Sequence, residues 1–381
     1  MSSISSIELA VVIGLSVVLL CQLLYWAVFM FRVRKRARYL ANQLPGISIV
    51  VCARNEAENL EKLIPALVAQ KYAAPKQIVV VDDGSTDDTP MTLAVLRQKY
   101  PELYTTTIPI DNKFSHGKKL ALTVGIKAAR YEHIVFTDAD CIPASEHWLT
   151  NIVERYANPD KQLVIGYGRY AKHPGLLNLF IRYETFWNAV QYMGVAVALK
   201  PFMGVGRNLS YTKTLFNNSS QFRHTMTILS GDDDLFVCEM GKRKNTAIVF
   251  EYESQTISEP KRTWMEYVAQ KSRHLTTAPL YPSIVKFVLV SEQFTRFFFW
   301  LFGIVAFVLA FYLPSTVILY SVIIAFAARF ITIYTALGIA ANNMHESRMW
   351  LLALPMDIII PLMQAMAWIT GILTQRRNTW K

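Results

Sequence analysis

The stretch GISIVVCARNEAENLEKLIPALVAQKYAAPKQIVVVDD, residues 46–83, contains two apolar runs separated by an amphipathic one. The runs at 46–54 and 77–83 are rich in Val and Ile and have the length of buried strands. Between them, residues 56–70 repeat their apolar side chains at helical spacing. A strand, a helix and a second strand in this order predict one unit of a parallel α/β sheet.

The same alternation continues through the next 55 or so residues. A helix is expected after STDDTP, with Thr89 as its N-cap and Pro90 in its first turn. A strand near 104–110, a helix over 117–130 and the strand HIVFTD at 133–138 follow. Strands that alternate with helices of this length predict a doubly wound parallel sheet.

Carboxylates follow two of these strands: the pair Asp82-Asp83, and Asp138 with Asp140. Ligands of doubly wound sheets bind outside the carboxyl ends of the strands. An Asp after a strand is also a common turn former or helix cap, and VDDGSTDDT alone permits that interpretation. Carboxylates two residues apart on an extended chain point the same way, and they suit Mg²⁺ or Mn²⁺. The pattern predicts a phosphorylated ligand that is bound together with a divalent metal.

The composition indicates a membrane protein with a soluble domain. The chain has 381 residues, 52% of them hydrophobic, and a mean hydropathy of +0.25. Residues 7–31 are long and apolar enough to cross a hydrocarbon core of roughly 30 Å, and the basic run RVRKRAR at 32–38 follows them. A cleaved signal peptide carries its positive charge before the apolar run, so we expect a retained anchor. The positive-inside rule then places the following domain in the cytoplasm.

Apolar segments return after the soluble region, at 294–313, 315–340 and 350–373. The third segment contains Asp357 and two prolines, so it either crosses the membrane once or is re-entrant, and we expect a cytoplasmic tail. The resulting prediction is a multi-pass protein of the cell inner membrane. Its expected parts are an anchor with a basic stop (1–38), a cytoplasmic catalytic domain with interfacial helices (39–290), and a C-terminal region of two or three spans with a basic tail (291–381).

The net charge of +11 fits anionic lipid headgroups and a phosphorylated substrate at least as well as nucleic acid. Membrane lipids are therefore expected partners, and nucleic acid is not. A transporter or channel would place ionisable residues in its spans, where this chain has only Glu8, Arg296, Arg329 and Asp357. That class of function is disfavoured.

Seven motifs carry a resemblance to a known family. They are ISIVVCARNEAENL, VVVDDGSTDDT, HGKKLALTVGI, VFTDAD, GVGRNLSY, GDDDLF and QKSRH, and they occur in this order between residues 47 and 274. The chain resembles the membrane-bound family 2 glycosyltransferases, which include the cellulose, chitin and hyaluronan synthases. The resemblance implies a GT-A fold (a doubly wound mixed, mainly parallel sheet) flanked by transmembrane helices. It also implies a UDP-sugar donor, inverting transfer, and Mg²⁺ or Mn²⁺ as cofactor.

The same resemblance implies roles for individual residues. Asp233, the second acid of GDDD, matches the general base, and Asp138 and Asp140 match the metal motif, with Asp140 the better candidate for a direct ligand. Asp232 and His274 fall on the acceptor side. The residues implied in donor binding are Glu56, Asp82, Asp83, Lys118, Asp138, Asn208, Gln270 and Arg273.

Simpler structural interpretations of these motifs remain open. The acids of GDDD are also favoured at the N-terminus of a helix, which DLFVCEMGKR is expected to form. Arg273 also fits a basic face against lipid headgroups. Lys118 or Lys119 also fits a solvated helix face, so at most one of them is given a role.

Departures from the family pattern bear on the product. The tryptophan of QxxRW is His274 here, and Thr123 stands where many relatives have asparagine. About four membrane spans are also few to enclose a channel that carries a polymer. We therefore favour transfer of one or a few hexosyl or N-acetylhexosaminyl units to a lipid-linked or polysaccharide acceptor. The alternatives are a processive synthase that exports its product, and an anchored UDP-sugar sensor without catalysis. The sugar, the acceptor and any protein partners are not specified by the motifs.

Two aromatic-rich segments, 174–194 and 264–275, have helical spacing. Core packing is one interpretation of both. The other is that they lie along the bilayer and guide an amphiphilic acceptor, since Trp and Tyr favour membrane interfaces.

Overall fold

The computed structural model describes residues 6–33, 44–109, 117–226, 228, 230–313, 315–346 and 348–374. The basic residues 34–38 and the tail from residue 375, which bear on the predicted topology, lie outside these ranges. The chain divides into two compact units: Met1–Arg34 with Pro282–Met363, and Lys35–Tyr281 with Gln364–Lys381.

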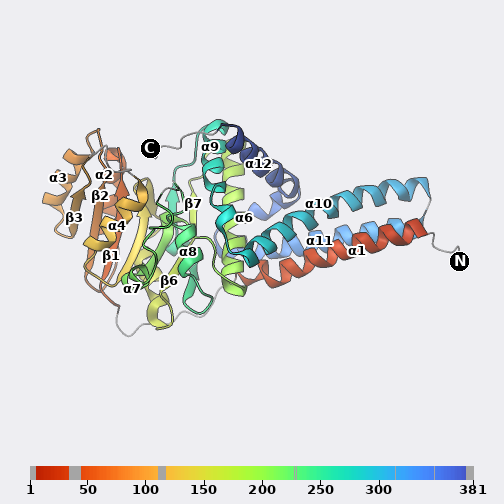
Figure 1. Ribbon diagram of the computed structural model, residues 1–381, viewed down its shortest axis with the longest axis horizontal. Helices are drawn as coiled ribbons and strands as arrows, with labels where there is room; N and C mark the ends of the chain where they lie inside the picture. Colours follow the sequence, from red (N-terminus) through yellow and green to blue (C-terminus); the bar gives the residue numbers. More distant parts are fainter. Residues whose placement is uncertain are drawn as a thin grey trace. The chain divides into compact units, whose positions relative to one another are not determined.

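The second unit contains a seven-stranded sheet in the order β3-β2-β1-β4-β8-β6-β9 (Figure 1). Its first four strands by position are parallel, as the alternating pattern predicts, whereas β8 runs antiparallel to both β4 and β6. The strands are β1 (Ile47–Ala53), β2 (Lys76–Asp82), β3 (Leu103–Thr107), β4 (His133–Asp138), β6 (Leu163–Gly166), β8 (Leu209–Thr212) and β9 (Thr246–Val249). The sheet is therefore mixed and mainly parallel.

The strand register brings the predicted acids to one edge of the sheet. Ala53 of β1 pairs with Asp82 of β2, and the adjacent Cys52 pairs with Asp138 of β4. Because these strands are parallel, their carboxyl ends coincide, and both acidic motifs lie where ligands of such sheets bind.

Helices cover both faces of this sheet. On one face, α2 (Ala57–Val68) packs its leucines against Ile49 and Val51. On the other face, α4 (Lys118–Ala128) approaches so closely that a Cβ on Gly125 would lie 2.6 Å from a Val50 methyl. The remaining helices of the parallel half are α3 (Thr89–Lys99), α5 (Trp148–Val153) and the 3-10 turn η2 (Glu154–Ala157).

The predicted cap of α3 is wrong by one position. Asp88 is the N-cap, whereas Thr89 is the first helical residue and Pro90 the second. The Thr89 hydroxyl accepts a hydrogen bond from the Glu56 N–H at 2.9 Å. The side chain therefore holds the loop after β1 and does not cap its own helix.

The C-terminal half of this unit adds a three-stranded sheet and the helices that complete the site. The small sheet has the order β5-β10-β7, formed by β5 (Cys141–Pro143), β10 (Thr256–Ser258) and β7 (Gly168–Tyr170). The helical elements are α6 (Leu176–Ala198), η3 (Gly206–Asn208), α7 (Lys213–Asn217), α8 (Asp234–Met240), η4 (Tyr252–Ser254), α9 (Trp264–Leu275) and η5 (Ala278–Leu280).

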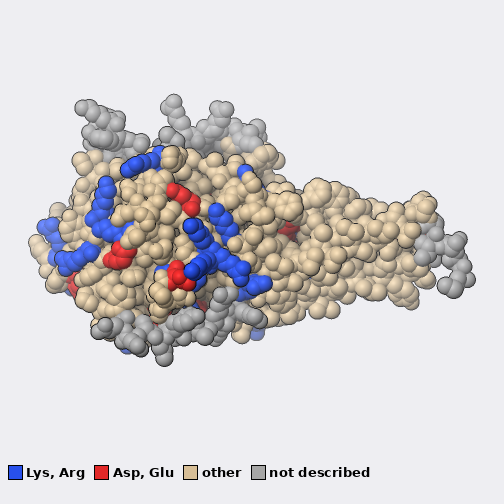
Figure 2. Space-filling view, turned by 60° about the horizontal axis from the view of Figure 1, so that its bottom comes forward, with Lys and Arg blue, Asp and Glu red and all other residues tan. Residues whose placement is uncertain are grey.

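The other unit is helical. Four helices in the described part of the chain are long and apolar enough to cross a membrane. They are α1 (Ser6–Val28, continued by the turn η1, Met30–Arg32), α10 (Ser283–Tyr312), α11 (Thr316–Asn343) and α12 (Ala353–Thr374, preceded by η6, Met349–Leu352). The third C-terminal segment is thus one helix that continues through Pro361. In Figure 2, the surface of the helical unit is almost without charged atoms, whereas lysine and arginine side chains gather on the sheet-bearing unit.

Four charged residues of these apolar helices are buried and paired: Glu292, Arg296, Arg329 and Asp357. Arg329 of α11 donates to both carboxylate oxygens of Asp357 on α12, at 2.8 and 3.0 Å. Arg296 of α10 forms an ion pair with Glu292 one turn earlier, and Gln22 of α1 accepts a hydrogen bond from Arg329 at 3.2 Å. Buried charges are tolerated in apolar surroundings when they are paired and hydrogen-bonded, so this network neutralises itself.

Candidate active site

A cavity of about 1080 Å³ opens in the sheet-bearing unit, at the carboxyl ends of β1 and β4. Its walls come from three groups of residues: the ends of these strands, the loops at 203–207 and 230–234, and the facing helices α6 and α9 with the end of α12. The sequence motifs predicted to act together extend from Glu56 to His274 along the chain. The fold brings most of them to this one cavity.

Lys118, the first residue of α4, lies among the acids of the cavity. Its ammonium donates to Asp138 Oδ1 at 2.7 Å and lies 3.3 Å from Asp232 Oδ2. Burial would lower the pKa of Lys118, but Asp138, Asp232 and Asp233 raise it well above its usual value. Lys118 is therefore permanently charged and links the TDAD motif to the GDDD motif. The solvated alternative does not describe it.

Lys119 has a different environment. Its ammonium is buried and donates to three backbone carbonyls, those of Thr225, Ile228 and Ser230, at 2.6–2.8 Å. These contacts fix the loop that leads into GDDD. The two lysines of GKK thus divide the tasks, one in the cavity and one in the loop that forms its wall.

Asp138 and Asp140 are suited to hold a divalent cation. Together with Cys141 they place three possible ligand atoms within 4.8 Å of one another. Burial, and then the neighbouring Asp140, keep the pKa of the Cys141 thiol well above its usual value, and this thiol lies 2.9 Å from the Ser258 hydroxyl. A protonated thiol is a poor ligand for a hard ion, so the two carboxylates are the fitting donors.

The two carboxylates differ in their surroundings. Burial would raise the pKa of Asp138, but the Lys118 ammonium outweighs it and holds that pKa below its usual value. Burial and then the Asp138 charge raise the pKa of Asp140. Lys118 engages one oxygen of Asp138 at 2.7 Å, whereas the Cys141 thiol, a weak donor, lies 3.4 Å from Asp140 Oδ1. Asp140 is therefore the carboxylate with more capacity for a cation.

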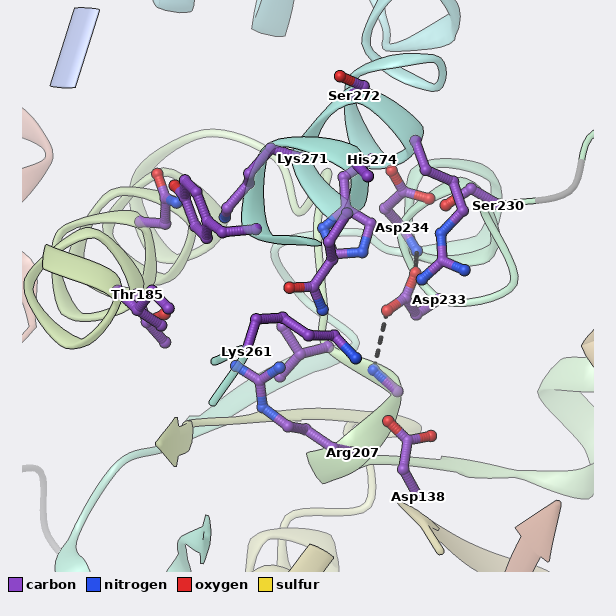
Figure 3. Close-up of a pocket in the computed structure, with 18 of the residues that line it drawn as sticks. Asp138, Thr185, Arg207, Ser230, Asp233, Asp234, Lys261, Lys271, Ser272 and His274 are labelled. Atoms are coloured by element: carbon purple, nitrogen blue, oxygen red, sulfur yellow. Dashed lines mark hydrogen bonds between the residues drawn. The ribbon is translucent and has the colours of Figure 1, made fainter. Parts of the chain in front are cut away.

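Asp233 is held in a defined orientation at the start of α8. Its Oδ2 accepts a hydrogen bond from the Gly206 N–H at 2.8 Å, and its Oδ1 accepts one from the Asp234 N–H at 2.8 Å (Figure 3). Burial, and then the charges of Asp232 and Asp234, raise the pKa of Asp233 to about 7. A carboxylate with a pKa near the working pH is suited to take up a proton.

The third acid of GDDD has a structural role. Asp234 caps the first turn of α8 through the Leu235 N–H, and it accepts hydrogen bonds from the hydroxyls of Thr277 and Tyr281. The helix-terminus interpretation of GDDD thus describes Asp234, and it also describes Asp233, which is the N-cap of α8. All three acids of GDDD line the cavity.

The loop after β1 contributes Glu56, which lines the cavity. Asn55 precedes it with a φ of 57°, and its side-chain oxygen accepts a hydrogen bond from the Thr86 N–H at 2.8 Å. This bond connects the loops that follow β1 and β2. Burial, opposed by the hydrogen bond from Asn59, raises the pKa of Glu56.

Asp82 and Asp83 are buried at the end of β2 and are not among the described residues that line the cavity. Asp82 Oδ1 accepts a hydrogen bond from the Ser85 N–H at 3.0 Å. Its Oδ2 is buried and has no hydrogen-bond partner among the described residues. Buried polar atoms are normally paired, so this oxygen is a candidate for contact with a ligand.

Helix α9 contributes the predicted residues of the QxxRW-like motif. Gln270, Arg273 and His274 all line the cavity, and His274 points into it in Figure 3. Burial, and then the charges of Lys271 and Arg273, hold the pKa of His274 well below its usual value. The imidazole is therefore neutral near pH 7 and can donate and accept one hydrogen bond each.

Asn208 is a correction to the predicted site. Its amide donates to the carbonyls of Tyr167 and Ser254, and its oxygen accepts a hydrogen bond from Trp148 Nε1. The side chain is 1% exposed, and both of its N–H donors are engaged in the core. We therefore assign Asn208 a packing role and remove it from the donor site.

The preceding residue, Arg207, lies in the cavity but was not among the residues predicted for the site from the sequence. Its guanidinium donates to the Gly168 carbonyl at 2.7 and 3.0 Å and lies over the Tyr170 ring, 4.7 Å from its centroid. Figure 3 shows it near Lys261, on the same side of the cavity as Asp138. GVGRNLSY does contain this arginine, but the motif alone does not say which of two adjacent polar residues turns inward.

A polar cluster on the facing helices was also missed. Lys271 of α9 lies 2.6 Å from Glu184 Oε2 on α6, and Asn188 donates to Glu184 Oε1 at 2.9 Å. All three line the cavity. The spacing of Glu184 and Asn188, one helical turn apart, predicts that they share a face, but not that this face turns toward α9.

The two segments expected at the membrane interface differ in their exposure. On α6, Phe186 and Trp187 are buried, so core packing describes them. On α9, Trp264 is 45% exposed and Met265 is 76% exposed. An interfacial role therefore fits the start of α9 and not the aromatic residues of α6.

Comparison with known proteins identifies the sheet-bearing region. Residues 48–193 match the family model described as Glycosyl transferase family 2. This region of the chain is therefore similar to the family 2 glycosyltransferases. The matched segment includes the strand-end acids and the TDAD motif, so the resemblance drawn from these motifs is confirmed.

Curated relatives are similar over part of the chain. The poly-beta-1,6-N-acetyl-D-glucosamine synthase of Staphylococcus aureus strain COL is 30% identical over 129 residues, which are 31% of this chain and 30% of that protein. The synthase of the same name from Staphylococcus epidermidis is 25% identical over 181 residues, 47% of this chain and 41% of that protein. The matches span well under half the length of these relatives.

A solved structure is similar over nearly the whole chain. The mannosyltransferase PcManGT from Pyrobaculum calidifontis, in complex with GDP-Man and Mn²⁺, has a TM-score of 0.57 and 20% identity, over 96% of this chain and 99% of that one. At this identity the likeness concerns the fold. It confirms the predicted GT-A-like α/β architecture with accompanying apolar helices.

Proposed function

We propose that the protein transfers a hexosyl or N-acetylhexosaminyl unit from a UDP-sugar to a hydroxyl of a lipid-linked or polysaccharide acceptor, with inversion at the anomeric carbon. The observation that carries this proposal is the arrangement around Lys118. This lysine joins the TDAD carboxylates to the GDDD motif in one cavity, and the basic residues of α9 line the same cavity.

Asp233 is the proposed general base. The acceptor oxygen attacks the anomeric carbon as its proton passes to the Asp233 carboxylate, while the bond from that carbon to the diphosphate oxygen breaks and UDP leaves. One displacement of this kind inverts the configuration. The hydrogen bonds from Gly206 and Asp234 fix the direction of the carboxylate, and a positioned base contributes roughly 10²–10⁴-fold to such a step.

Cationic side chains are proposed to bind the diphosphate and to stabilise the charge that develops on it. Arg273 and Lys118 are the predicted residues, and we add Arg207 because its guanidinium lies in the same cavity. Preorganised cations in a cavity with little water stabilise a leaving anion more strongly than in bulk solvent. Glu56, Asp82, Asp83 and Gln270 are proposed to hold the rest of the donor. Asp82 Oδ2, which has no hydrogen-bond partner among the described residues, is the atom proposed to contact it.

Asp138 and Asp140 are proposed to hold Mg²⁺ or Mn²⁺. When bound there, the ion would neutralise phosphate charge as a Lewis acid. Lys118 orients Asp138 independently of the ion through its hydrogen bond.

The proposed product is a singly or sparingly extended acceptor. Asp232 and His274 line the cavity near the base, and His274 provides a small polar ring where a synthase of the resembled type has a tryptophan. A neutral imidazole can bond one sugar hydroxyl but offers less stacking surface than an indole. Product length separates this proposal from a processive synthase.

The proposed setting is the cytoplasmic face of a cell inner membrane, with α1 and α10 to α12 as spans. Its support is the apolar length of these helices and the basic run 32–38 after the first one. Accessibility of single introduced cysteines to an impermeant reagent, in intact cells and in inverted vesicles, tests this orientation.

The deciding experiment is nucleotide release by the purified full-length chain with Mg²⁺ or Mn²⁺ across a donor panel. The panel contains UDP-N-acetylglucosamine, UDP-glucose and GDP-mannose, the last because PcManGT binds it. We expect one UDP-sugar to give metal-dependent release that Asp140→Asn and Asp233→Asn abolish. The matched control is Asp160→Asn, because this carboxylate is exposed and pairs only with Lys244 among the described residues. Donor binding without release at any metal concentration would instead support the anchored sensor.

A further inference from the structure

The volume of the cavity lies at the upper end of the range for small-molecule sites. Pockets that hold one small molecule usually enclose about 300–1000 Å³, and this one encloses about 1080 Å³. The strand ends and the loops at 203–207 and 230–234 account for the proposed donor contacts. Apart from Gln270, Arg273 and His274, the wall made by α6, α9 and α12 makes none of the proposed donor contacts. This wall is therefore available to the acceptor.

One section of this wall is a polar cluster. Glu184 is 2% exposed and pairs with Lys271 at 2.6 Å, while Asn188 donates to its other oxygen at 2.9 Å. Lys271 also lies over the Tyr267 ring, 5.7 Å from its centroid. An ammonium has three N–H donors, so Lys271 can hold Glu184 and a ligand oxygen together. Figure 3 shows Lys271 extending from α9 toward α6, the helix that carries Thr185.

Other side chains of the wall are apolar. Trp264 packs on Phe180 at a ring distance of 5.5 Å, yet it remains 45% exposed, and its neighbour Met265 is 76% exposed. Met366 of α12 is 44% exposed. All but Phe180 line the cavity. Exposed apolar side chains next to a polar pocket are a common feature of sites for amphiphilic ligands.

Part of this wall belongs to a helix suited to a membrane. Met366, Thr370 and Gly371 line the cavity, and all three fall within 349–371, one of the four candidate spans. The Ser272 hydroxyl of α9 donates to the Ala367 carbonyl of α12 at 2.7 Å, which fixes this end of α12 beside α9. A hydrocarbon chain is the ligand that such a surface would accept.

We propose that this wall binds an amphiphilic acceptor. Its hydroxyl-bearing headgroup lies on Asn188 and Lys271, and its hydrocarbon chain lies along Trp264, Met265 and Met366. This inference rests on the proposed transferase function and selects a lipid-linked acceptor over a soluble glycan. Glu184 is a positioning residue that orients Asn188 and Lys271.

The test uses alkyl β-D-glucosides and alkyl N-acetylglucosaminides with methyl, octyl, decyl and dodecyl chains, each below its micellar concentration. The full-length protein is placed in nanodiscs and given the donor of highest turnover. The measured quantity is the glycoside concentration that half-maximally changes nucleotide release, whether the glycoside raises release as an acceptor or lowers it as a blocking ligand. We expect this concentration to fall about fourfold for every two methylenes that become half-buried on the wall.

Variants separate the polar from the apolar side chains of the wall. Met366→Ser and Trp264→Ser are expected to reduce the dependence on chain length, whereas Asn188→Ala raises the half-maximal concentration about fivefold for every chain, as expected for one lost hydrogen bond. The matched control is Met91→Ser on α3, because Met91 is 71% exposed and does not line the cavity. This control should keep the wild-type dependence.

Two results would overturn the inference: no dependence on chain length in the wild type, or the same dependence in Met366→Ser and Trp264→Ser as in Met91→Ser. A soluble oligosaccharide that is used more efficiently than any alkyl glycoside would also overturn it. These failures differ from failure of the transferase itself, because metal-dependent nucleotide release that Asp140→Asn abolishes is measured first.

Discussion

The pH dependence of Asp233 gives a quantitative test of the proposed base. Burial and two neighbouring carboxylates raise the pKa of Asp233 to about 7 in the folded protein, against the opposing charge of Lys118. A general base must be ionised to accept a proton. We therefore expect kcat/KM to fall about tenfold for each pH unit below roughly 7 and to level off above it, since this parameter reports groups of the free enzyme.

The Asp233→Asn variant is expected to lose this limb of the profile along with the activity. The loss should be roughly 10²–10⁴-fold, the contribution of a positioned base. Asn keeps the size of the side chain and one acceptor oxygen, so it can retain the hydrogen bond from either the Gly206 or the Asp234 N–H but not both. Asp160→Asn serves as the control and should keep the wild-type profile.

The same raised pKa has a consequence for stability, with a defined sign. The folded state keeps the Asp233 proton up to about pH 7, whereas the unfolded chain releases it near 3.9. The stabilisation from this protonation is therefore complete below pH 4 and is lost as the pH rises to about 7. With ~1.4 kcal/mol for each pKa unit, the loss amounts to at most about 4 kcal/mol, and Asp233→Asn should not show it.

Two assays check these expectations. Nucleotide release between pH 5.5 and 8.5 gives the kinetic profile, and thermal unfolding of wild type and Asp233→Asn at pH 4.5 and 8 gives the difference in stability. We expect Asp233→Asn to gain stability relative to wild type at the higher pH. A flat kcat/KM profile together with an active Asn variant would refute the assignment of the base.

Three further substitutions test the framework of the site and of the helices. Gly206→Ala should lower kcat with little change in the unfolding temperature, because its Cβ would lie 3.0 Å from the Lys118 ammonium, which must move by a few tenths of an ångström. Kinetics and thermal unfolding measured together check this. Arg329→Met should destabilise the helical unit by about 3–5 kcal/mol by leaving Asp357 without its main partner, and adding Asp357→Leu should recover most of the loss in detergent unfolding. Asn55→Gly should be tolerated better than Asn55→Ala, by about 1 kcal/mol in unfolding measurements, because the φ of 57° is costly for alanine.

The parallel half of the fold could be predicted from the sequence because each element there has a clear local pattern. β1, β2 and β4 are continuous apolar runs, and α2 and α4 have helical periodicity, so the predicted ranges agree with the structure to within two residues. The N-cap of α3 is Asp88 and not the predicted Thr89, because the Thr89 hydroxyl accepts a hydrogen bond from Glu56 in the loop after β1. Residue propensity alone favours Thr89 as the cap, but this tertiary hydrogen bond engages its side chain elsewhere.

The site was predictable only where a motif fixed the residue. Asp233 and Lys118 were found through GDDD and GKK, and both lie in the cavity. Arg207 was missed in favour of Asn208, because the rotation of the short turn η3 decides which of two adjacent polar side chains faces inward. Glu184 was missed because its partner, Lys271, lies 87 residues away on a different helix. No local pattern reports such a pairing.

Lys118 helps to make the clustering of acidic side chains in the cavity possible, in addition to any bound metal. Asp138, Asp140, Asp232 and Asp233 are among the carboxylates that line the cavity, and neighbouring like charges raise one another's pKa values. Lys118 bonds Asp138 and approaches Asp232, so it offsets part of this repulsion in the protein itself. It also lowers the pKa of Asp233, although burial outweighs it. The lysine therefore couples the two acidic motifs electrostatically, because a change at the TDAD end alters the field that sets the proton affinity of the proposed base.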